Sequence, residues 1–244
     1  MGLLSGKNAV TYGGGGVIGA AVARSYARQG ARVFVAGRNL DRVQQVATSI
    51  RQSGGLIEAA QVDAADASSL EIHAKAVLDL TGQIDVVFNA TSNQDVQGTQ
   101  LTELSYSDFM QPVHTAVTIH FLVSTVIGRH MAGQGSGVIL AMAGGREAVP
   151  NLGGSHVAWS ALAGLCRQLA CELGPSGVRV AWILSPGSPE SDHAIDTDAD
   201  AELSMLGKRP RLEDVAEAAT FLASDMAPTM TATEINLTGG TIVD

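Results

Sequence analysis

The sequence predicts a single-domain α/β fold in which helices cover both faces of a doubly wound, parallel sheet of about seven strands. Short apolar runs rich in valine and isoleucine alternate along the chain with longer amphipathic runs. Strands that alternate with helices pair in parallel through right-handed crossovers, which places helices on both faces of the sheet. No repeat, low-complexity linker or block of charge divides the 244 residues, so we expect residues 1–244 to form one domain.

The hydrophobic period places each element along the chain. The expected strands are the short runs at residues 8–12, 32–36, 56–62, 84–89, 137–142, 178–184 and 234–237. The expected helices are the longer runs at residues 17–29, 40–53, 68–80, 106–131, 156–173 and 212–224. Residues 188–208 are an irregular, acidic interval, which we expect to be a variable lid over the substrate.

Composition and charge narrow the classes of function. The chain is 45% hydrophobic and 16% charged, which is enough apolar material for a sizeable core;. A net charge of −9 argues against binding to nucleic acid;. The most apolar run, residues 115–128, is too short to span a bilayer, and no basic and apolar leader stands at the N-terminus;. Cys166 and Cys171 lack metal-ligand spacing and suit a reducing compartment, so we expect a cytoplasmic protein with no membrane partner;.

A run of four glycines, residues 13–16, joins the first expected strand to the first helix. The backbone N–H groups of such a turn and of the helix N-terminus can approach a pyrophosphate, so we interpret it as a dinucleotide site. The alternative is a tight turn that needs positive φ. The second strand ends in Ala36-Gly37-Arg38, with no carboxylate for a ribose 2′-hydroxyl. Arginine pairs with a 2′-phosphate, so we expect NADP(H) rather than NAD(H), unless Arg38 is an ordinary surface cation.

Further motifs follow in a fixed order. Residues 12–19 correspond to the motif T-G-x-x-x-G-x-G with Val17 at its middle glycine, residues 88–91 keep half of N-N-A-G, and the C-terminal stretch RPRLEDVAEAATFLASDMAPTMTATEINLTGG completes the set. In these features the chain resembles the short-chain dehydrogenase/reductase superfamily over nearly its whole length. The resemblance implies a Rossmann-like fold, a nicotinamide cofactor and a small carbonyl or alcohol substrate. The implied cofactor contacts are Gly13, Gly15, Gly16, Ile18, Gly19, Arg38, Asp63, Asn89, Ala90, Pro186 and Gly187.

The resemblance also indicates where the family's catalytic residues would stand. Family chemistry uses a tyrosine to transfer the proton, a lysine four residues later, a serine on the fifth strand and an asparagine on the long helix. Aligned on ALAGLCRQLACEL, the chain has Ser155 at the tyrosine and Trp159 at the lysine. The serine position falls on Met142 or Ala143, and the asparagine position on Ala116. We therefore expect an atypical member without the standard proton-transfer residues.

His120 is a candidate to replace this machinery. It follows Ala116 by one helical turn, so both residues share a face that in this family points toward the cleft;. Histidine serves as a general acid or base near neutral pH, and the alternative is a hydrogen-bonded helix histidine at an oligomer contact. His114 stands two residues before Ala116, so its side chain is expected to point away from the cleft. The candidate catalytic residues are thus His120, Ser155 and Trp159. We expect no metal, since the aspartates of residues 196–200 lack the glycine and glutamate of a calcium loop;.

Three functions remain open at this stage. The first is a divergent NADP(H)-linked oxidoreductase in which His120, water or the substrate's own groups exchange the proton. The second is an enzyme of non-redox chemistry, such as an isomerase, dehydratase or cyclase. The third is a catalytically inactive binding or assembly partner. We expect the first, as a homo-oligomer (dimer or tetramer) that pairs through the apolar helices at residues 106–131 and 159–173.

Overall fold

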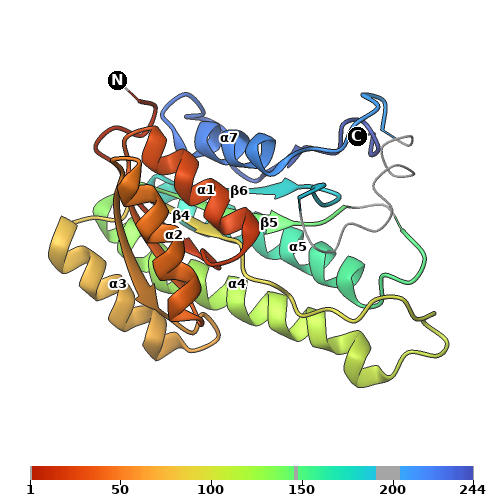
Figure 1. Ribbon diagram of the computed structural model, residues 1–244. Helices are drawn as coiled ribbons and strands as arrows, with labels where there is room; N and C mark the ends of the chain where they lie inside the picture. Colours follow the sequence, from red (N-terminus) through yellow and green to blue (C-terminus); the bar gives the residue numbers. More distant parts are fainter. Residues whose placement is uncertain (1, 146–147, 191–203, 244) are drawn as a thin grey trace.

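The computed structural model describes residues 2–145, 148–190 and 204–243 (Figure 1). Seven parallel strands form one sheet in the order β3-β2-β1-β4-β5-β6-β7. The strands are β1 (Asn8–Tyr12), β2 (Arg32–Gly37), β3 (Leu56–Gln61), β4 (Val86–Asn89), β5 (Gly137–Ala143), β6 (Val178–Leu184) and β7 (Thr233–Asn236). The helices are α1 (Val17–Arg28), α2 (Leu40–Gln52), α3 (Ala67–Thr81), α4 (Tyr106–Gln134), α5 (Ser155–Leu173) and α7 (Leu212–Ala223), with a 3₁₀ turn, η1 (Gly174–Ser176).

The predicted single-domain, doubly wound α/β fold is confirmed. Every predicted strand and helix is present, and their ends agree with the prediction to within three residues. Of the predicted lid, residues 191–203 lie outside the described residues, while 188–190 and 204–208 form no helix or strand. The periodicity located the elements well because each one must bury an apolar stripe or face against the sheet.

Each face of the sheet is covered by three of the described helices. On β1, Val10 and Tyr12 pack toward α3, α4 and α5, whereas Ala9 packs toward α1, α2 and α7. Figure 1 shows α4 and α5 side by side below the sheet and α1 and α2 in front of it. Successive side chains of a strand point to opposite faces, so both layers are held by the same strands.

The strand order reverses between β1 and β4, and this reversal determines where a ligand can bind. From β1 the chain builds outward through β2 to β3, and then returns to place β4 on the other side of β1. The connections that leave the carboxyl ends of β1 and β4 therefore separate and open a crevice. The glycine turn of residues 13–16 follows β1 directly at this edge.

The long helix α4 is the one helix, within the described ranges, that is long and apolar enough to cross a membrane. Its most apolar window is 44% buried inside the molecule. It packs against α5, α3 and β5, where Val123, Ile127 and Met131 are part of the core. This is the environment of a core helix of a globular domain, which passes the same test of length and composition.

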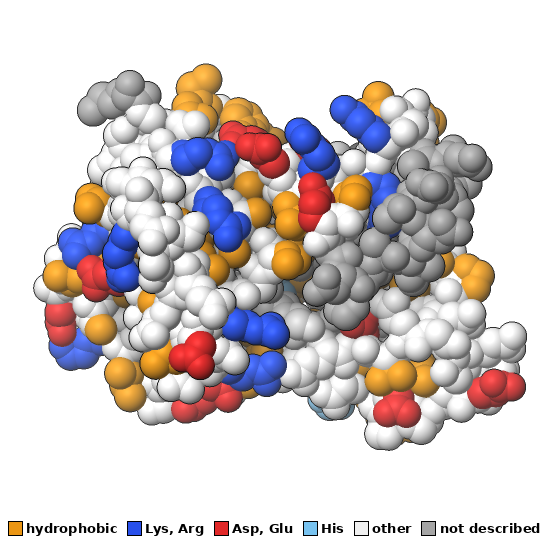
Figure 2. Space-filling view, viewed as in Figure 1, with side chains coloured by type: hydrophobic (Ala, Val, Ile, Leu, Met, Phe, Trp, Pro, Cys, Tyr) orange, Lys and Arg blue, Asp and Glu red, His pale blue; other side chains and the backbone are white. Residues whose placement is uncertain are grey.

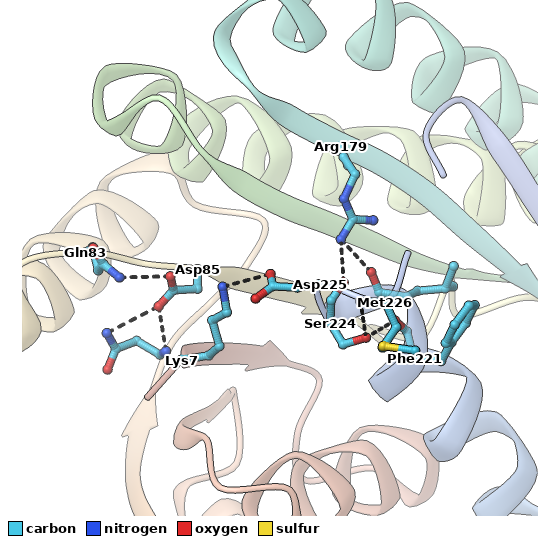
Figure 3. Close-up of polar contacts among 10 residues, drawn as sticks. Lys7, Gln83, Asp85, Arg179, Phe221, Ser224, Asp225 and Met226 are labelled. Carbon is cyan, nitrogen blue, oxygen red and sulfur yellow. Dashed lines mark hydrogen bonds and ion pairs between the residues drawn. The ribbon is translucent and has the colours of Figure 1, made fainter. Parts of the chain in front are cut away.

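Polar contacts fasten the last helix to the amino-terminal edge of the sheet (Figure 3). The guanidinium of Arg179 on β6 donates to the backbone oxygens of Leu222 and Ser224 at 2.8 and 3.2 Å and to that of Met230 at 3.2 Å. Beside it, Lys7 forms an ion pair of 3.1 Å with Asp225. The single planar guanidinium of Arg179 thus supplies hydrogen bonds to three backbone carbonyls at and beyond the end of α7;.

Replacing Arg179 with lysine is expected to lower the free energy of unfolding by about 1 kcal/mol. An ammonium group on a flexible stem cannot reach the three carbonyls together, so at least one of them loses its partner. Urea denaturation measures the change, and Arg129→Lys on the exposed side of α4 is the matched control. Equal free energies of unfolding for the two variants would show that the hydrogen bonds of the Arg179 guanidinium contribute nothing to stability.

Candidate functional site

A cleft of about 390 Å³ opens at the carboxyl edge of the sheet, between the glycine turn, the ends of β2 and β3 and the amino-terminal half of α4. Its walls carry both charged and uncharged polar side chains. The lining residues are Tyr12, Gly13, Gly37, Arg38, Val62, Asp63, Ala64, Ala65, Thr91, Ser92, Gln94, Gln111, His114, Thr115, Thr118 and Ile119. The cleft lies beside the reversal of strand order, where open α/β sheets bind their ligands.

The glycine turn is built for close approach of backbone groups. Gly13 has φ +74°, and a Cβ there would lie 2.5 Å from the oxygen of Ala90. A Cβ on Gly19 would lie 2.4 Å from the oxygen of Gly13. Helix α1 begins at Val17 after Gly16, and no side chain caps it. The first N–H groups of α1 therefore remain available to an anionic ligand at the edge of the cleft.

The neighbouring predicted cofactor contacts are distributed around this turn. Gly15 faces α2, since a Cβ there would lie 3.0 Å from the Cβ of Arg42. Ile18 is half-buried on α1 against the core. Gly13, Arg38 and Asp63 line the cleft itself. Pro186 and Gly187, which follow β6, are not among the lining residues, and the oxygen of Pro186 accepts from Nη2 of Arg209 at 2.6 Å.

Arg38 and Asp63 are the charged residues that line the cleft, and the amide of Gln94 contacts the first of them. Arg38 and Asp63 are both exposed, and the Asp63 carboxylate accepts from the N–H of Ala65 at 3.0 Å. With its amide oxygen assigned toward the guanidinium, Gln94 accepts from Nη2 and Nη1 of Arg38 at 2.8 and 3.1 Å;. A side chain 56 positions later in the chain therefore meets the predicted phosphate-binding arginine.

The cleft also contains residues that sequence reasoning missed. His114 was expected to face elsewhere, and this expectation is wrong, because His114 lines the cleft together with Thr115 and Thr118 of α4. The cleft extends along the amino-terminal half of α4, so this part of the helix faces the ends of β2 and β3. Gln94 belongs to the connection that follows β4 at the same carboxyl edge, and that position is the one signal in the sequence that points to it.

Asn89 and His120 form a buried pair beneath the cleft. The Asn89 side-chain nitrogen lies 3.1 Å from Nδ1 of His120, and its oxygen accepts from the N–H and the hydroxyl of Thr91 at 3.1 and 2.8 Å. Asn89 and His120 are 3% and 4% exposed. Since the amide nitrogen donates, Nδ1 of His120 is the acceptor, and the proton of the neutral ring is on Nε2.

Burial also decides the charge of His120. Removal from water lowers the pKa of His120 to about 4, so the ring is neutral near pH 7;. A neutral imidazole whose Nδ1 lone pair already accepts from Asn89 is poorly suited to exchange a proton with a substrate. The geometry favours one part of the other interpretation: His120 is a hydrogen-bonded helix histidine that holds the end of β4, and it lies in the interior of the domain rather than on a surface where chains could meet.

Ser155, the first residue of α5, is fully buried. Its hydroxyl donates to Oδ2 of Asp95 at 2.5 Å, and the same carboxylate accepts from the side chain of Gln97. The polypeptide around Asp95 lies directly over the beginning of α5, because a Cβ on Gly153 would lie 2.4 Å from the oxygen of Val96. The Ser155 hydroxyl is thus held by the β4–α4 connection.

Trp159 lies one turn later on α5, half-buried against the core. Atoms of its indole ring would lie 2.3–2.5 Å from a Cβ on Gly144, so the ring rests on the backbone that follows β5. The indole fills the space beside the end of β5, next to Ala143. Ala116 on α4 is buried at 6% exposure. These residues bring one ring N–H and no charge to this side of the site.

Metal-ligating groups do not gather anywhere in the described part of the chain. No set of three or more histidine, cysteine, aspartate or glutamate side chains there could hold a metal ion. The two cysteines are free: Cys166 is buried and Cys171 is exposed.

Known proteins with similar sequences and structures are named as dehydrogenases and reductases. A model of the enoyl-(acyl carrier protein) reductase family matches residues 15–241. D-threitol dehydrogenase of Mycolicibacterium smegmatis is 30% identical over 97% of this chain and 93% of its own, and 3-oxoacyl-[acyl-carrier-protein] reductase of Chlamydia pneumoniae is 31% identical over 97% of both. A crystal structure of a short-chain type dehydrogenase/reductase from Mycobacterium marinum superposes over 100% of both chains with a TM-score of 0.87 and 26% identity.

Proposed function

This chain belongs to the short-chain dehydrogenase/reductase superfamily, and we propose that it is an NADP(H)-linked oxidoreductase of a small carbonyl or alcohol substrate. Membership implies a nicotinamide cofactor, and the named relatives are oxidoreductases. The observation that carries the choice of NADP(H) is Arg38, which lines the cleft at a strand end, Ala36-Gly37-Arg38, that has no carboxylate. A guanidinium there favours a 2′-phosphate over a free 2′-hydroxyl.

The residues present fit a dinucleotide. The N–H groups of the glycine turn and of the start of α1 would hold the pyrophosphate, because Gly13 and Gly19 let the turn close without a Cβ clash and no side chain caps α1;. Arg38 would pair with the 2′-phosphate, and Asp63 would contact the adenine as in the family. When bound, the cofactor would supply or accept the hydride.

With Ser155 and Trp159 aligned to the family's tyrosine and lysine, the proton has to be exchanged without those two residues. Ser155 is buried and donates to Asp95, Trp159 has no charge, and His120 is neutral with Nδ1 engaged by Asn89. We therefore assign proton exchange to water or to the substrate's own groups, and we interpret His120 as the residue that positions Asn89.

One observation favours a second candidate, non-redox chemistry such as isomerisation, dehydration or cyclisation. The indole of Trp159 rests against Gly144 at the end of β5, on the side of the site where the family's catalytic residues act. A ring there restricts the space in which a nicotinamide could lie beside a substrate. The adenosine end of the cleft is unaffected, so nucleotide binding without hydride transfer is the signature of this candidate.

Thermal unfolding with NADPH and with NADH tests the proposal. Binding at 100 times Kd stabilises the fold by about 2.7 kcal/mol, which raises Tm by roughly 5–10 °C. We expect NADPH to give this shift at a lower concentration than NADH. Transfer of deuterium from labelled NADPH to a panel of small carbonyls then separates redox from non-redox use. If neither nucleotide raises Tm, the proposed function is wrong, and the catalytically inactive partner becomes the better interpretation.

We also propose that the protein is a cytoplasmic homo-oligomer that pairs through α4 and α5, with a small molecule as its substrate and neither nucleic acid nor membrane as a partner. Phe121 on α4 and Val157 on α5 are 49% and 43% exposed, which is high for large apolar side chains;. On the face drawn in Figure 2, Lys and Arg side chains are interspersed with Asp and Glu, unlike a surface for nucleic acid;. Light scattering after size exclusion should give two or four times the mass of the chain, and a monomer would contradict the assembly.

A further inference from the structure

We propose that Gln94 is a second determinant of cofactor specificity, presented to Arg38 by a loop that Ser155 anchors. This inference rests on the proposed NADP(H) site. The loop is residues 91–98, here called the Gln94 loop, and it connects the end of β4 toward α4. Its two central residues bind opposite sides of the site: Gln94 meets Arg38 on the nucleotide side, and Asp95 meets Ser155 on the catalytic side.

In the contact between Gln94 and Arg38, one amide oxygen accepts hydrogen bonds from both terminal nitrogens of the guanidinium. The amide oxygen accepts from Nη2 at 2.8 Å and from Nη1 at 3.1 Å, so both outer nitrogens of the guanidinium converge on it. A phosphate takes the same two nitrogens when arginine binds it in bidentate fashion. Both side chains line the cleft, so an entering 2′-phosphate would meet the pair directly.

The Gln94 loop is fastened on the side away from Arg38. The Ser155 hydroxyl, fully buried, donates to Asp95 at 2.5 Å, and the N–H of Gly98 donates to the oxygen of Asn151 at 2.9 Å. Between these points the oxygen of Val96 closes on the backbone of Gly153. Gln94 itself has φ +56°, a conformation that residues other than glycine adopt rarely and that the surrounding contacts must hold;. The position of Gln94 is therefore set by the loop's anchors.

The amide of Gln94 would make the site bind NADP(H) more tightly than NAD(H). With a ribose that carries a free 2′-hydroxyl, the Arg38–Gln94 pair can stay closed. A 2′-phosphate takes the fork of Arg38, and rotation of the amide then turns its NH₂ group toward the phosphate oxygens. Gln94 thus changes from acceptor to donor, and only the phosphorylated ligand gains that bond. A carboxylate at position 94 has no donor and keeps Arg38 in an ion pair.

Binding of adenosine 2′,5′-bisphosphate and of AMP tests the role of Gln94 without the nicotinamide half. Calorimetric titration of Gln94→Glu should show affinity for the bisphosphate lowered about 30-fold and affinity for AMP changed less than about threefold. Thr118→Glu, which adds the same charge to another exposed residue that lines the cleft, should lower the affinity for the bisphosphate less than fivefold. In an Arg38→Leu background, Gln94→Glu should have almost no further effect, since the two residues act as a pair.

The outcomes separate this inference from the proposed function. Equal losses for the Gln94 and Thr118 variants, or additive effects of the Gln94 and Arg38 variants, would overturn the role of Gln94. Failure of the wild type to prefer the bisphosphate over AMP would overturn it too. If the wild type prefers the bisphosphate but NADPH transfers no deuterium, the proposed oxidoreductase fails while the specificity of the adenosine end stands.

The hydrogen bond from Ser155 to Asp95 is tested separately, by amide hydrogen exchange and by ligand preference. Ser155→Ala removes the donor to Asp95, so amide hydrogen exchange in residues 92–98 should speed up at least tenfold, and the preference for the bisphosphate over AMP should fall severalfold. Ser155→Thr, which keeps the hydroxyl, should restore both. Unchanged exchange and unchanged preference in the alanine variant would show that Ser155 does not anchor the Gln94 loop.

Discussion

Replacing Arg38 with leucine is expected to weaken the binding of NADPH about 10- to 100-fold and to change the binding of NADH less than about threefold. Leucine keeps some of the aliphatic stem and removes the guanidinium, which faces the cleft beside Asp63 and Gln94. A doubly charged phosphate loses its strongest hydrogen-bond donors, whereas a ribose hydroxyl loses little. Fluorescence titration of NADPH and NADH measures both affinities.

Arg24→Leu is the control for this change in charge. Arg24 is exposed on α1 and is not among the residues that line the cleft, so both affinities should stay close to those of the wild type. A parallel loss of NADPH and NADH in the Arg38 variant would mean that the arginine binds a part common to both nucleotides. Unchanged binding of NADPH would mean that Arg38 is a solvated surface cation, which is the alternative interpretation of that residue.

Two buried histidines are expected to make the fold sensitive to mild acid, at a cost of about 2 kcal/mol for each between pH 7.5 and pH 5. His73 on α3 lies 3.0 Å from the hydroxyl of Tyr12, and His120 pairs with Asn89. Burial lowers the pKa of each ring to about 4. An unfolded histidine titrates near 6.5, so the unfolded chain binds more protons than the folded one between pH 6.5 and pH 4. Stability is therefore complete above pH 6.5 and is lost as the pH falls toward 4.

The difference between a variant and the wild type isolates the contribution of His120. His120→Gln keeps an amide acceptor for Asn89 and removes the titrating ring, so its loss of stability from pH 7.5 to pH 5 should be smaller by about 2 kcal/mol than that of the wild type. Urea denaturation at the two pH values provides the measurement. His114→Gln, at an exposed position of the same helix, should leave the loss unchanged. Identical pH dependence in the His120 variant and the wild type would show that the ring is not held neutral.

The elements of the fold were predictable from the chain because their signals are local. The short apolar run of β1, which is buried on both faces of the sheet, and the helical period of α1 each arise from the need to bury apolar side chains, and this need acts over a few residues;. The ends of α4 and β4 were the least accurate. Helix α4 continues to Gln134, three residues past its predicted end, and β4 begins at Val86 rather than at residue 84.

A smaller part of the candidate site was predictable for the same reason. Gly13, Gly19 and Arg38 stand within 26 residues of one another, and the turn and the strand end that present them follow from neighbouring residues. Gln94 and His114 gave no such signal, because polar residues on a connection or a helix end are usually solvated. The sequence likewise marks Ser155 as an unusual residue at the start of a familiar helix, but its partner Asp95 stands 60 positions earlier.

The sequence by itself determined the succession of strands and helices along the chain, the position of the glycine turn after β1 and that of the arginine at the end of β2. Only the tertiary structure decided which distant side chains meet: Gln94 with Arg38, Asp95 with Ser155, the Trp159 ring with Gly144 and Asn89 with His120. The physical reason is that backbone propensity and apolar period act between near neighbours, whereas these contacts depend on how connections fold over the carboxyl edge of the sheet.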